Sequence, residues 1–390
     1  MLSPQSTEVV RATLPAVGGA LDEITARFYA GMFAAHPELE RDLFNRGNQA
    51  AGAQRQALAG AIAAYATMLV EHPDVRPGAM LARIAHKHVA LGVTEDQYKI
   101  VHRHLFAAIV SVLGEAVTAE VAAAWDEVYW LMANELIALE TKLYGAAGVT
   151  PGEVWSEYAV TAAEPQGSTA LALALRPADG GPLPRFEPGQ YVSVAVQLPD
   201  GARQIRQYSL SAAPGSDDLR ITVKRDGEVS RWLHANAAPG TLLSLSRPCG
   251  DLTLADGDEP LLLASAGIGI TPMVGMLDHL VRTGATRPTT VVHGDRSPAD
   301  HAHAAELTAL VSQLPTAEIH RWYETDATAP DRAGYVDLAG VELPEGVRAY
   351  LCGPLPFMRA ARAELLRRGV PAQRIHYEVF GPDLWLAGAR

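Results

Sequence analysis

The spacing of apolar residues changes twice along this 390-residue chain, and no single fold suits all three patterns. Up to about residue 147, apolar residues recur at helical spacing, as in DEITARFYAGMF and AAAWDEVYWLMANELIALETKLY. A chain of this length can form several domains that each bury a core. We therefore expect an all-α domain over residues 1–147, followed by domains of a different class.

From GAAGVTPGEVW onward, apolar residues alternate with polar ones, as strands with one buried face require. Glycine and proline turns separate these runs, which predicts an antiparallel β-barrel over residues 148–258; the alternating sets are Leu171, Leu173 and Leu175, then Val192, Val194 and Val196, then Leu219, Ile221 and Val223. Over residues 259–390, the short runs PLLLAS, TTVVHG, AEIHRWY and RAYLCGP alternate with helical stretches. That repeat predicts an α/β domain with a parallel sheet.

Composition narrows the class of partner. The net charge of −12 and the lack of a Lys/Arg-rich run argue against nucleic acid and anionic membranes, and favour a small-molecule substrate. Cys249 and Cys352 lie far apart, which suits a reducing compartment without disulfides. The opening segment lacks the pattern of a secretory signal, so we expect a cytoplasmic protein without an integral membrane segment; the longest uncharged run, PLLLASAGIGITPMVGML, contains Gly and Pro and favours a strand, a turn and a helix start.

Four histidines fall in the short stretch RIAHKHVALGVTEDQYKIVHRHL. In a helix, His86 and His88 point roughly 200° apart, so they cannot share a role. His88 continues the apolar stripe of Leu81, Ile84 and Ala85, whereas His86 follows Arg83 and precedes Lys87. His88 is the inward one, but a lone inward histidine is more often a core residue than a metal ligand. The residues alone leave both readings open.

The stretch FYAGMFAAHPELERDLFNRGNQAAGAQRQAL resembles the B-to-E helix region of a globin. With KHVALGV, DQY, RQYSL, SAGIGITP, YLCGP and EVFGP, nearly the whole chain resembles the flavohaemoglobin family. The resemblance implies a haem b globin, an FAD-binding barrel and an NAD(P)H-binding α/β domain, in that order.

For the globin part, the resemblance implies that His88 is the iron ligand and that Tyr29, Gln54 and Leu58 lie on the distal side with Phe44. Tyr98 and Glu140 would complete the proximal pocket, and Lys87 would belong to the same catalytic set. A carboxylate that accepts the free imidazole N–H makes the ligand more electron-donating, which favours oxygen activation. Without the resemblance, Tyr98 and Glu140 read as a buried tyrosine and a surface charge.

RQYSL offers what a flavin site needs: Arg206 for the pyrophosphate, Tyr208 to cover the ring and Ser209 near the reactive ring nitrogen, with Gln207 between them. Backbone amides after Gly227, at Val229 and Ser230, can add phosphate donors at a helix start. Tyr191 in GQY is either a flavin contact or a barrel aromatic. An edge strand with solvated polar residues is the alternative for RQYSL.

SAGIGITP predicts a pyrophosphate turn that feeds a helix, with Thr271 as N-cap and Pro272 at the first helical position. Pro272 replaces the third glycine of G-x-G-x-x-G, so the motif resembles the NAD(P)H lobe of ferredoxin-reductase-like proteins instead. The candidate cofactor contacts are Gly267, Ile268, Gly269, Ile270, Thr271, Pro272, then Cys352, Gly353 and Pro354 beside the nicotinamide, and Glu378, Val379, Phe380, Gly381 and Pro382 against the flavin. Cys352 can equally be a buried apolar residue.

The coenzyme is NADPH or NADH, because Asp295 suits a free ribose whereas Arg296 and Ser297 suit a 2′-phosphate, with a slight lean to NADPH. By resemblance, the activity is a nitric oxide dioxygenase, which uses O2 to oxidise NO to nitrate. A flavohaem reductase of lipid hydroperoxides or ferric iron, and a haem-based O2/NO redox sensor, are the alternatives. We expect a monomer, with a lipid as a further candidate for the distal pocket.

Overall fold

The structure is a computed structural model that describes residues 1–74 and 78–382. Its contacts divide into two compact units. Unit 1 comprises residues 1–155 with the segments 197–205 and 381–382, and unit 2 comprises residues 156–196 and 206–380. The two units are described separately below.

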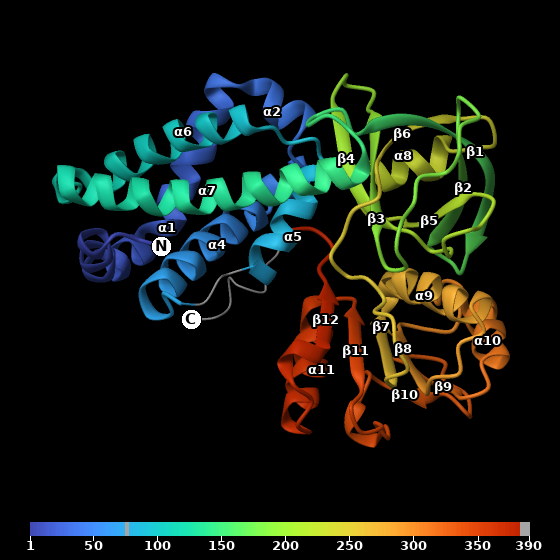
Figure 1. Ribbon diagram of the computed structural model, residues 1–390. Coiled ribbons are helices and arrows are strands. Elements are labelled where there is room, and N and C mark those ends of the chain that lie inside the picture. The colour runs from blue at the N-terminus through green and yellow to red at the C-terminus, as the bar shows by residue number, and fades with distance from the viewer. Residues whose placement is uncertain (75–77, 383–390) are drawn as a thin grey trace. The chain divides into compact units, whose positions relative to one another are not determined.

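Unit 1 is built from helices, as the apolar spacing predicts. They are α1 (Pro4–Ala35), α2 (Pro37–Asp42), α3 (Arg46–Ala50), α4 (Ala53–Glu71), α5 (Gly78–Val89), α6 (Glu95–Leu113) and α7 (Ala119–Ala147), with a 3₁₀ turn at Gly114–Ala116 (Figure 1). A capping box between Thr94 and Gln97 starts α6, and Gly148 ends α7 in the left-handed region with φ of 66°. The apolar core includes Ile24, Phe28, Tyr65, Leu105 and Trp125.

A six-stranded antiparallel sheet follows, which belongs to unit 2 except for Trp155, Gln197 and residues 203–205. Its strands run in the order β4-β3-β6-β1-β2-β5. They are β1 (Trp155–Gln166), β2 (Ala170–Pro177), β3 (Tyr191–Gln197), β4 (Arg203–Ser209), β5 (Leu219–Lys224) and β6 (Leu242–Ser246), with α8 (Glu228–Asn236) after β5. A bridge between Leu210 and Ile221 joins the two edges of this sheet, so it closes as the barrel that the sequence predicts. We call this part the barrel lobe.

The second sheet of unit 2 is parallel and has the order β10-β9-β8-β7-β11-β12. Its strands are β7 (Leu261–Ala266), β8 (Thr289–Asp295), β9 (Ala317–Tyr323), β10 (Arg332–Ala333), β11 (Arg348–Cys352) and β12 (Ile375–Glu378). The associated helices are α9 (Ile270–Arg282), α10 (Ala304–Gln313) and α11 (Leu355–Arg367), with 3₁₀ turns at Gly267–Gly269, Leu338–Gly340 and Ala372–Arg374 (Figure 1). We call this part the α/β lobe.

The strand order of the α/β lobe reverses between β7 and β11. In open parallel sheets, ligands bind outside the carboxyl ends of the strands at such a reversal. The three apolar runs PLLLAS, TTVVHG and RAYLC, predicted as strands, form the centre of this sheet. One expectation was too simple: every residue of β3 except Gln197 is buried, so this strand lacks the alternation of buried and exposed residues that its sequence predicts. No helix among the described residues has the length and apolar character to span a bilayer.

Candidate functional site

His88 lies near the end of α5 and meets a buried carboxylate. Its Nδ1 is 2.8 Å from Oε1 of Glu140 on α7 and 2.9 Å from the hydroxyl oxygen of Tyr98 on α6. The Tyr98 hydroxyl donates to the same Glu140 oxygen at 2.5 Å. Glu140 is only 3% exposed, whereas the His88 side chain is 31% exposed. The three predicted proximal residues are therefore brought together from three helices.

These contacts decide where the protons lie. Burial first, and then the Glu140 carboxylate, raise the pKa of Tyr98, so its hydroxyl keeps its proton and donates it. A bare Nδ1 lone pair facing a carboxylate oxygen at 2.8 Å is repulsive, so Nδ1 of His88 carries the hydrogen. The Nε2 lone pair is then the one available to a metal, and the donor set fits a haem iron with an electron-rich imidazole.

The other histidines of the stretch have different surroundings. His102 pairs with Asp126 at 2.6 Å, and that carboxylate is about half exposed. His104 lies edge-on to His36. His86 is partly buried, like His88, and has polar or ring interactions of its own. Contact with a buried carboxylate therefore distinguishes His88 from His102.

Tyr29 lies in α1 within an aromatic group. Its ring contacts Phe28, Phe33 and Phe44, with an edge-on arrangement to Phe44 at 5.9 Å between centroids. Burial raises the pKa of Tyr29, although a hydrogen bond with Gln54 acts in the opposite direction. The phenol therefore keeps its proton at neutral pH and can donate it.

The remaining globin candidates sit on the same helices. Leu58 follows Gln54 by one turn on α4 and packs against the apolar core. Lys87 on α5 donates from Nζ to the backbone oxygen of Gly381 at 2.7 Å, so this lysine binds the last described part of the chain.

In the barrel lobe, Arg206 lies beside the start of α8. Its guanidinium is 3.2 Å from the carboxylate of Glu228, the first residue of that helix. The first-turn amides, including those of Val229 and Ser230, precede the first intrahelical bond, which Arg231 makes to Gly227. An arginine and the first-turn amides of a helix together fit a pyrophosphate. The Ser230 hydroxyl is used locally, since it accepts from the Asp226 amide and donates to the Gly227 carbonyl.

Ser209 ends β4 with a buried hydroxyl. Within residues 1–74 and 78–382, its Oγ has no hydrogen-bond partner. A buried hydroxyl without a partner costs free energy, and a polar atom of a flavin ring fits that position. Tyr208 beside it is partly exposed, and burial raises the pKa of its phenol against the opposing effect of Arg206. Gln207 is also partly exposed on the same strand.

Tyr191 begins β3 and is buried against a glycine. Its backbone exchanges two hydrogen bonds of 2.8 Å with Cys249. A Cβ at Gly250 would come within 3.1 Å of the Tyr191 ring, and φ of Gly250 is 125°, so only glycine suits this position. The local geometry holds Tyr191 within the barrel. It therefore supports the interpretation of Tyr191 as a barrel aromatic over that of a flavin contact.

In the α/β lobe, two turns pack backbone against backbone at the strand reversal. A Cβ at Gly269 would overlap the Cys352 carbonyl oxygen and lie 2.7 Å from the Gly353 amide nitrogen. A Cβ at Gly353 would lie 3.0 Å from the backbone nitrogen of Ala266. The glycines after β7 and β11 therefore allow the two turns to approach each other more closely than any side chain would permit. The backbone of these turns at the strand reversal fits a dinucleotide.

The helix after this turn starts earlier than predicted. The 3₁₀ turn Gly267–Gly269 runs directly into α9, which begins at Ile270 with Gly269 as N-cap. Thr271 is thus not the N-cap, and its hydroxyl instead donates to the Ile268 carbonyl at 3.1 Å. Pro272 is the third helical residue, not the first. Its missing N–H is tolerated because first-turn amides have no partner within the helix.

Cys352 and Glu378 lie opposite each other on β11 and β12. Both are buried, and burial, reinforced by the Glu378 carboxylate, raises the pKa of the Cys352 thiol well above its usual value. The thiol is therefore neutral at physiological pH. Glu378 accepts the amide of buried Val379, and the next residue, Phe380, exposes 44% of its surface. An exposed aromatic beyond a strand end can cover a planar ring.

The loop after β8, which the sequence offers as the candidate for coenzyme selection, has an internal hydrogen-bond pattern. Asp295 accepts the amide of Arg296 at 2.8 Å, and the Ser297 hydroxyl donates to Asp300 at 2.8 Å. The serine that suits a 2′-phosphate is thus held by a carboxylate, which weakens the argument for NADPH.

Two glycines that shape the site were not among the predicted site residues. Gly250 and Gly275 are required by close contacts, since a Cβ at Gly275 would lie 2.7 Å from the Leu210 carbonyl oxygen. A glycine inside a helix costs about 1 kcal/mol relative to alanine, so Gly275 in α9 was a detectable sign of tight packing.

Comparison with known proteins gives the same division of the chain. A globin family model matches residues 26–136, an oxidoreductase FAD-binding domain model matches 177–254, and an oxidoreductase NAD-binding domain model matches 263–363. Flavohemoproteins from Bordetella pertussis and Chromobacterium violaceum are 44% and 41% identical, each over 98% of this chain and 98% or more of the relative.

Solved structures agree. A crystal structure of flavohemoglobin from Malassezia yamatoensis with bound FAD and heme superposes with a TM-score of 0.90 at 34% identity, covering 97% of this chain and all of that one. The flavohem-like FAD/NAD binding domain of nitric oxide dioxygenase from Vibrio cholerae matches 59% of this chain and all of its own, with 35% identity and a TM-score of 0.57. Full-length identity above 40%, three family models in order and the matching fold place this chain in the flavohemoprotein family.

Proposed function

We propose that this flavohemoprotein is an NAD(P)H-dependent nitric oxide dioxygenase, with domains over residues 1–147, 148–258 and 259–390. When bound, the coenzyme supplies a hydride, FAD divides it into single electrons, and haem b uses them with O2. The Vibrio cholerae protein that shares the barrel and α/β lobes is a nitric oxide dioxygenase by name, which supports the proposal.

The observation that carries the proposal is the hydrogen-bonded group of His88, Tyr98 and Glu140. The buried Glu140 oxygen accepts from both other side chains, so it holds the His88 ring with Nδ1–H towards the carboxylate. An imidazole with this partner donates more electron density to a metal at Nε2 than one bonded to a neutral carbonyl. That property favours oxygen activation over reversible storage.

Tyr29 is proposed to act on the distal side. Its phenol keeps its proton because burial raises its pKa, and its hydrogen bond with Gln54 orients it. The role of Tyr29 is to donate a hydrogen bond to the oxidant, with Phe44 and Leu58 keeping water away from the same space.

In the other two domains, each group has one task. Arg206 and the start of α8 hold the pyrophosphate of the flavin, and Ser209 donates or accepts at its ring. The turn at Gly267–Gly269 and the backbone of Gly353 hold the coenzyme. Phe380 covers the flavin.

The reaction balances as NO + O2 + one electron giving nitrate, so each NAD(P)H supports two turnovers. The test is to measure NAD(P)H consumption and nitrate production by the full-length holoenzyme in aerated buffer, with and without NO. We expect NO to accelerate coenzyme consumption and to yield two nitrates for each NAD(P)H consumed. The same assay on Tyr29→Phe should show slower nitrate production. Its matched control is Tyr65→Phe, which removes a different buried phenol, on α4 of unit 1.

The alternatives predict different results. A reductase of lipid hydroperoxides or ferric iron would consume coenzyme on addition of cumene hydroperoxide or ferric citrate, but would form no nitrate from NO. A redox sensor would show no sustained turnover with any of these oxidants. Either outcome would overturn the proposal.

A further inference from the structure

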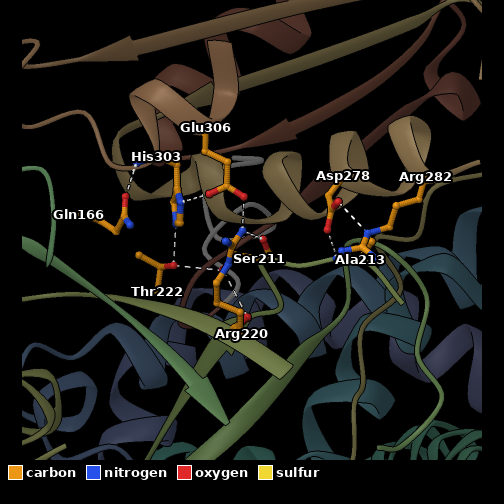
Figure 2. A network of polar contacts seen from close by, with 9 residues as sticks. All are labelled: Gln166, Ser211, Ala213, Arg220, Thr222, Asp278, Arg282, His303 and Glu306. Atoms are coloured by element: carbon orange, nitrogen blue, oxygen red, sulfur yellow. Dashed lines mark hydrogen bonds and ion pairs between the residues drawn. The ribbon is translucent and has the colours of Figure 1, made fainter. Parts of the chain in front are cut away.

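The two lobes of unit 2 meet at a polar network that none of the cofactor-binding motifs includes (Figure 2). It joins β1, β5 and the loop after β4 in the barrel lobe to α9 and α10 in the α/β lobe. Its members are Gln166, Ser211, Ala213, Arg220, Thr222, Asp278, Arg282, His303 and Glu306.

His303 is at the centre of this network. It is the N-cap residue of α10, with φ of 62°, and its side chain is completely buried. Its Nδ1 is 2.7 Å from Glu306 Oε2, and its Nε2 is 2.7 Å from the Thr222 hydroxyl in β5. Its backbone amide donates to the Gln166 side chain at the end of β1. The barrel lobe therefore holds His303 at two separate points.

Arg220 reaches the same place from β5. Its guanidinium is 2.6 Å from Glu306 Oε1, and its Nε donates to the Ser211 hydroxyl at 3.2 Å. Burial acts to raise the pKa of Glu306, but hydrogen bonds from His303 and Arg220 outweigh it and lower the pKa overall. The carboxylate is therefore ionised at neutral pH.

The hydrogen bonds form a closed ring in which Arg220 donates on both sides and Glu306 accepts on both sides. Because Nδ1 of His303 faces the Glu306 carboxylate, it carries the hydrogen; Nε2 then accepts from Thr222, which in turn accepts from Ser211 at 3.1 Å. His303 and Arg220 both donate to Glu306, which completes the ring. We call these five residues the inter-lobe ring. A buried network in which every member is satisfied fixes one geometry, whereas a partly satisfied one is costly.

The ring is close in the chain to groups that bind both cofactors. Ser211 follows Ser209 by two residues, and the Leu210 carbonyl lies against Gly275 of α9. Asp278, one turn further along α9, accepts the Ala213 amide at 2.8 Å. Helix α9, which follows the Gly267–Gly269 turn, is therefore packed directly against the segment that follows Ser209.

We propose that the inter-lobe ring positions the α/β lobe on the barrel lobe at the distance and angle that hydride transfer requires. Its residues are positioning residues, because none of them belongs to the motifs predicted to bind the coenzyme or the flavin. Interfaces between domains are mobile by default, and a misplacement of about 1 Å between reactants can cost about 100-fold in rate. The proposal concerns coenzyme-to-flavin transfer, which all the alternative functions share, so it stands or falls separately from NO dioxygenation.

The test uses the full-length holoenzyme and anaerobic stopped-flow reduction of the flavin by NADH and NADPH. Thr222→Val removes one link of the ring without changing its shape, and Thr222→Ser restores the hydroxyl. Glu306→Gln is a second variant at a partly exposed side chain, for use if Thr222→Val does not fold. The matched control is Glu364→Gln, which breaks an ion pair of α11 with Arg367 away from the ring.

We expect Thr222→Val and Glu306→Gln to lower the limiting rate of flavin reduction about tenfold, with the apparent coenzyme dissociation constant nearly unchanged. Thr222→Ser should regain the rate, and Glu364→Gln should retain it. Hydrogen exchange of the α10 amides in the oxidised holoenzyme, measured without coenzyme, should become faster in the two ring variants only. An unchanged limiting rate, whether or not the melting temperature falls, or an equal loss in Glu364→Gln, would overturn the proposal.

Discussion

Replacing Glu140 with glutamine should raise the reduction potential of the haem without releasing it. Glutamine has the same shape, and its carbonyl oxygen can still accept from Tyr98 and from Nδ1 of His88, now 2.5 and 2.8 Å from the carboxylate oxygen. The substitution removes the negative charge alone. A less electron-rich imidazole stabilises the ferric state less, so reduction becomes easier.

The magnitude follows from the hydrogen bond that changes. A bond to a charged group is worth about 1.5–3 kcal/mol and a neutral one about 1 kcal/mol, so on the order of 1 kcal/mol is lost. The electron-rich imidazole stabilises the ferric state, so we assign this loss to that state. About 59 mV corresponds to a tenfold change, or about 1.4 kcal/mol, for one electron, which gives an upward shift on the order of 40 mV.

The assay is a spectroelectrochemical titration of the purified holoenzyme, followed at the haem bands and corrected for haem content. Glu127→Gln is the control, because Glu127 lies on the same helix α7 but accepts from Ser3 at the start of the chain. The control should leave the potential unchanged. A Glu140→Gln potential within error of wild type, with full haem content and full turnover, would show that this carboxylate does not tune the iron.

Three further substitutions test the site at other points. Tyr29→Phe should speed O2 dissociation by roughly 10- to 100-fold, since a charge-assisted hydrogen bond is worth about 1.5–3 kcal/mol; an unchanged stopped-flow rate removes Tyr29 from the distal role. Gly269→Ala forces a Cβ against the Cys352 carbonyl, so it should abolish flavin reduction by coenzyme while dithionite still reduces the flavin; normal coenzyme turnover would contradict the predicted dinucleotide site at these turns. His88→Ala should lose the axial haem spectrum and His86→Ala should keep it, and matching spectra would refute the choice of ligand.

The sequence predicted the order of the three folds because each has its own period of burial. Helical spacing, strand alternation and short apolar runs before glycine turns are local patterns, so they can be recognised in a single sequence. Gly269 and Gly353 can be recognised in the same way, because each lies in a short motif. His86 and His88 are both partly buried, so the inward placement of His88 remains a prediction, and its partner Glu140, 52 residues away, was found by resemblance alone.

Features that depend on how elements pack escaped prediction. The ring residues Arg220 and His303 come from different lobes, and nothing local marks either as part of a network. Thr271 was misplaced as an N-cap because a Thr-Pro pair normally signals a helix start, whereas here the 3₁₀ turn at Gly267–Gly269 already supplies one. Local signals identify a helix but locate its first residue only to within one or two residues.

The packing of α9 illustrates why a single contact between the two lobes cannot set their relative orientation. A single point of contact fixes a distance but permits rotation about it. Gly275 and Asp278 are one turn apart on α9, about 5 Å by helical rise, and they hold its axis through Leu210 and Ala213. The inter-lobe ring holds a second helix, α10, through different strands of the barrel. Two separated attachments on two helices restrict rotation as well as translation, which is what a hydride donor and acceptor require.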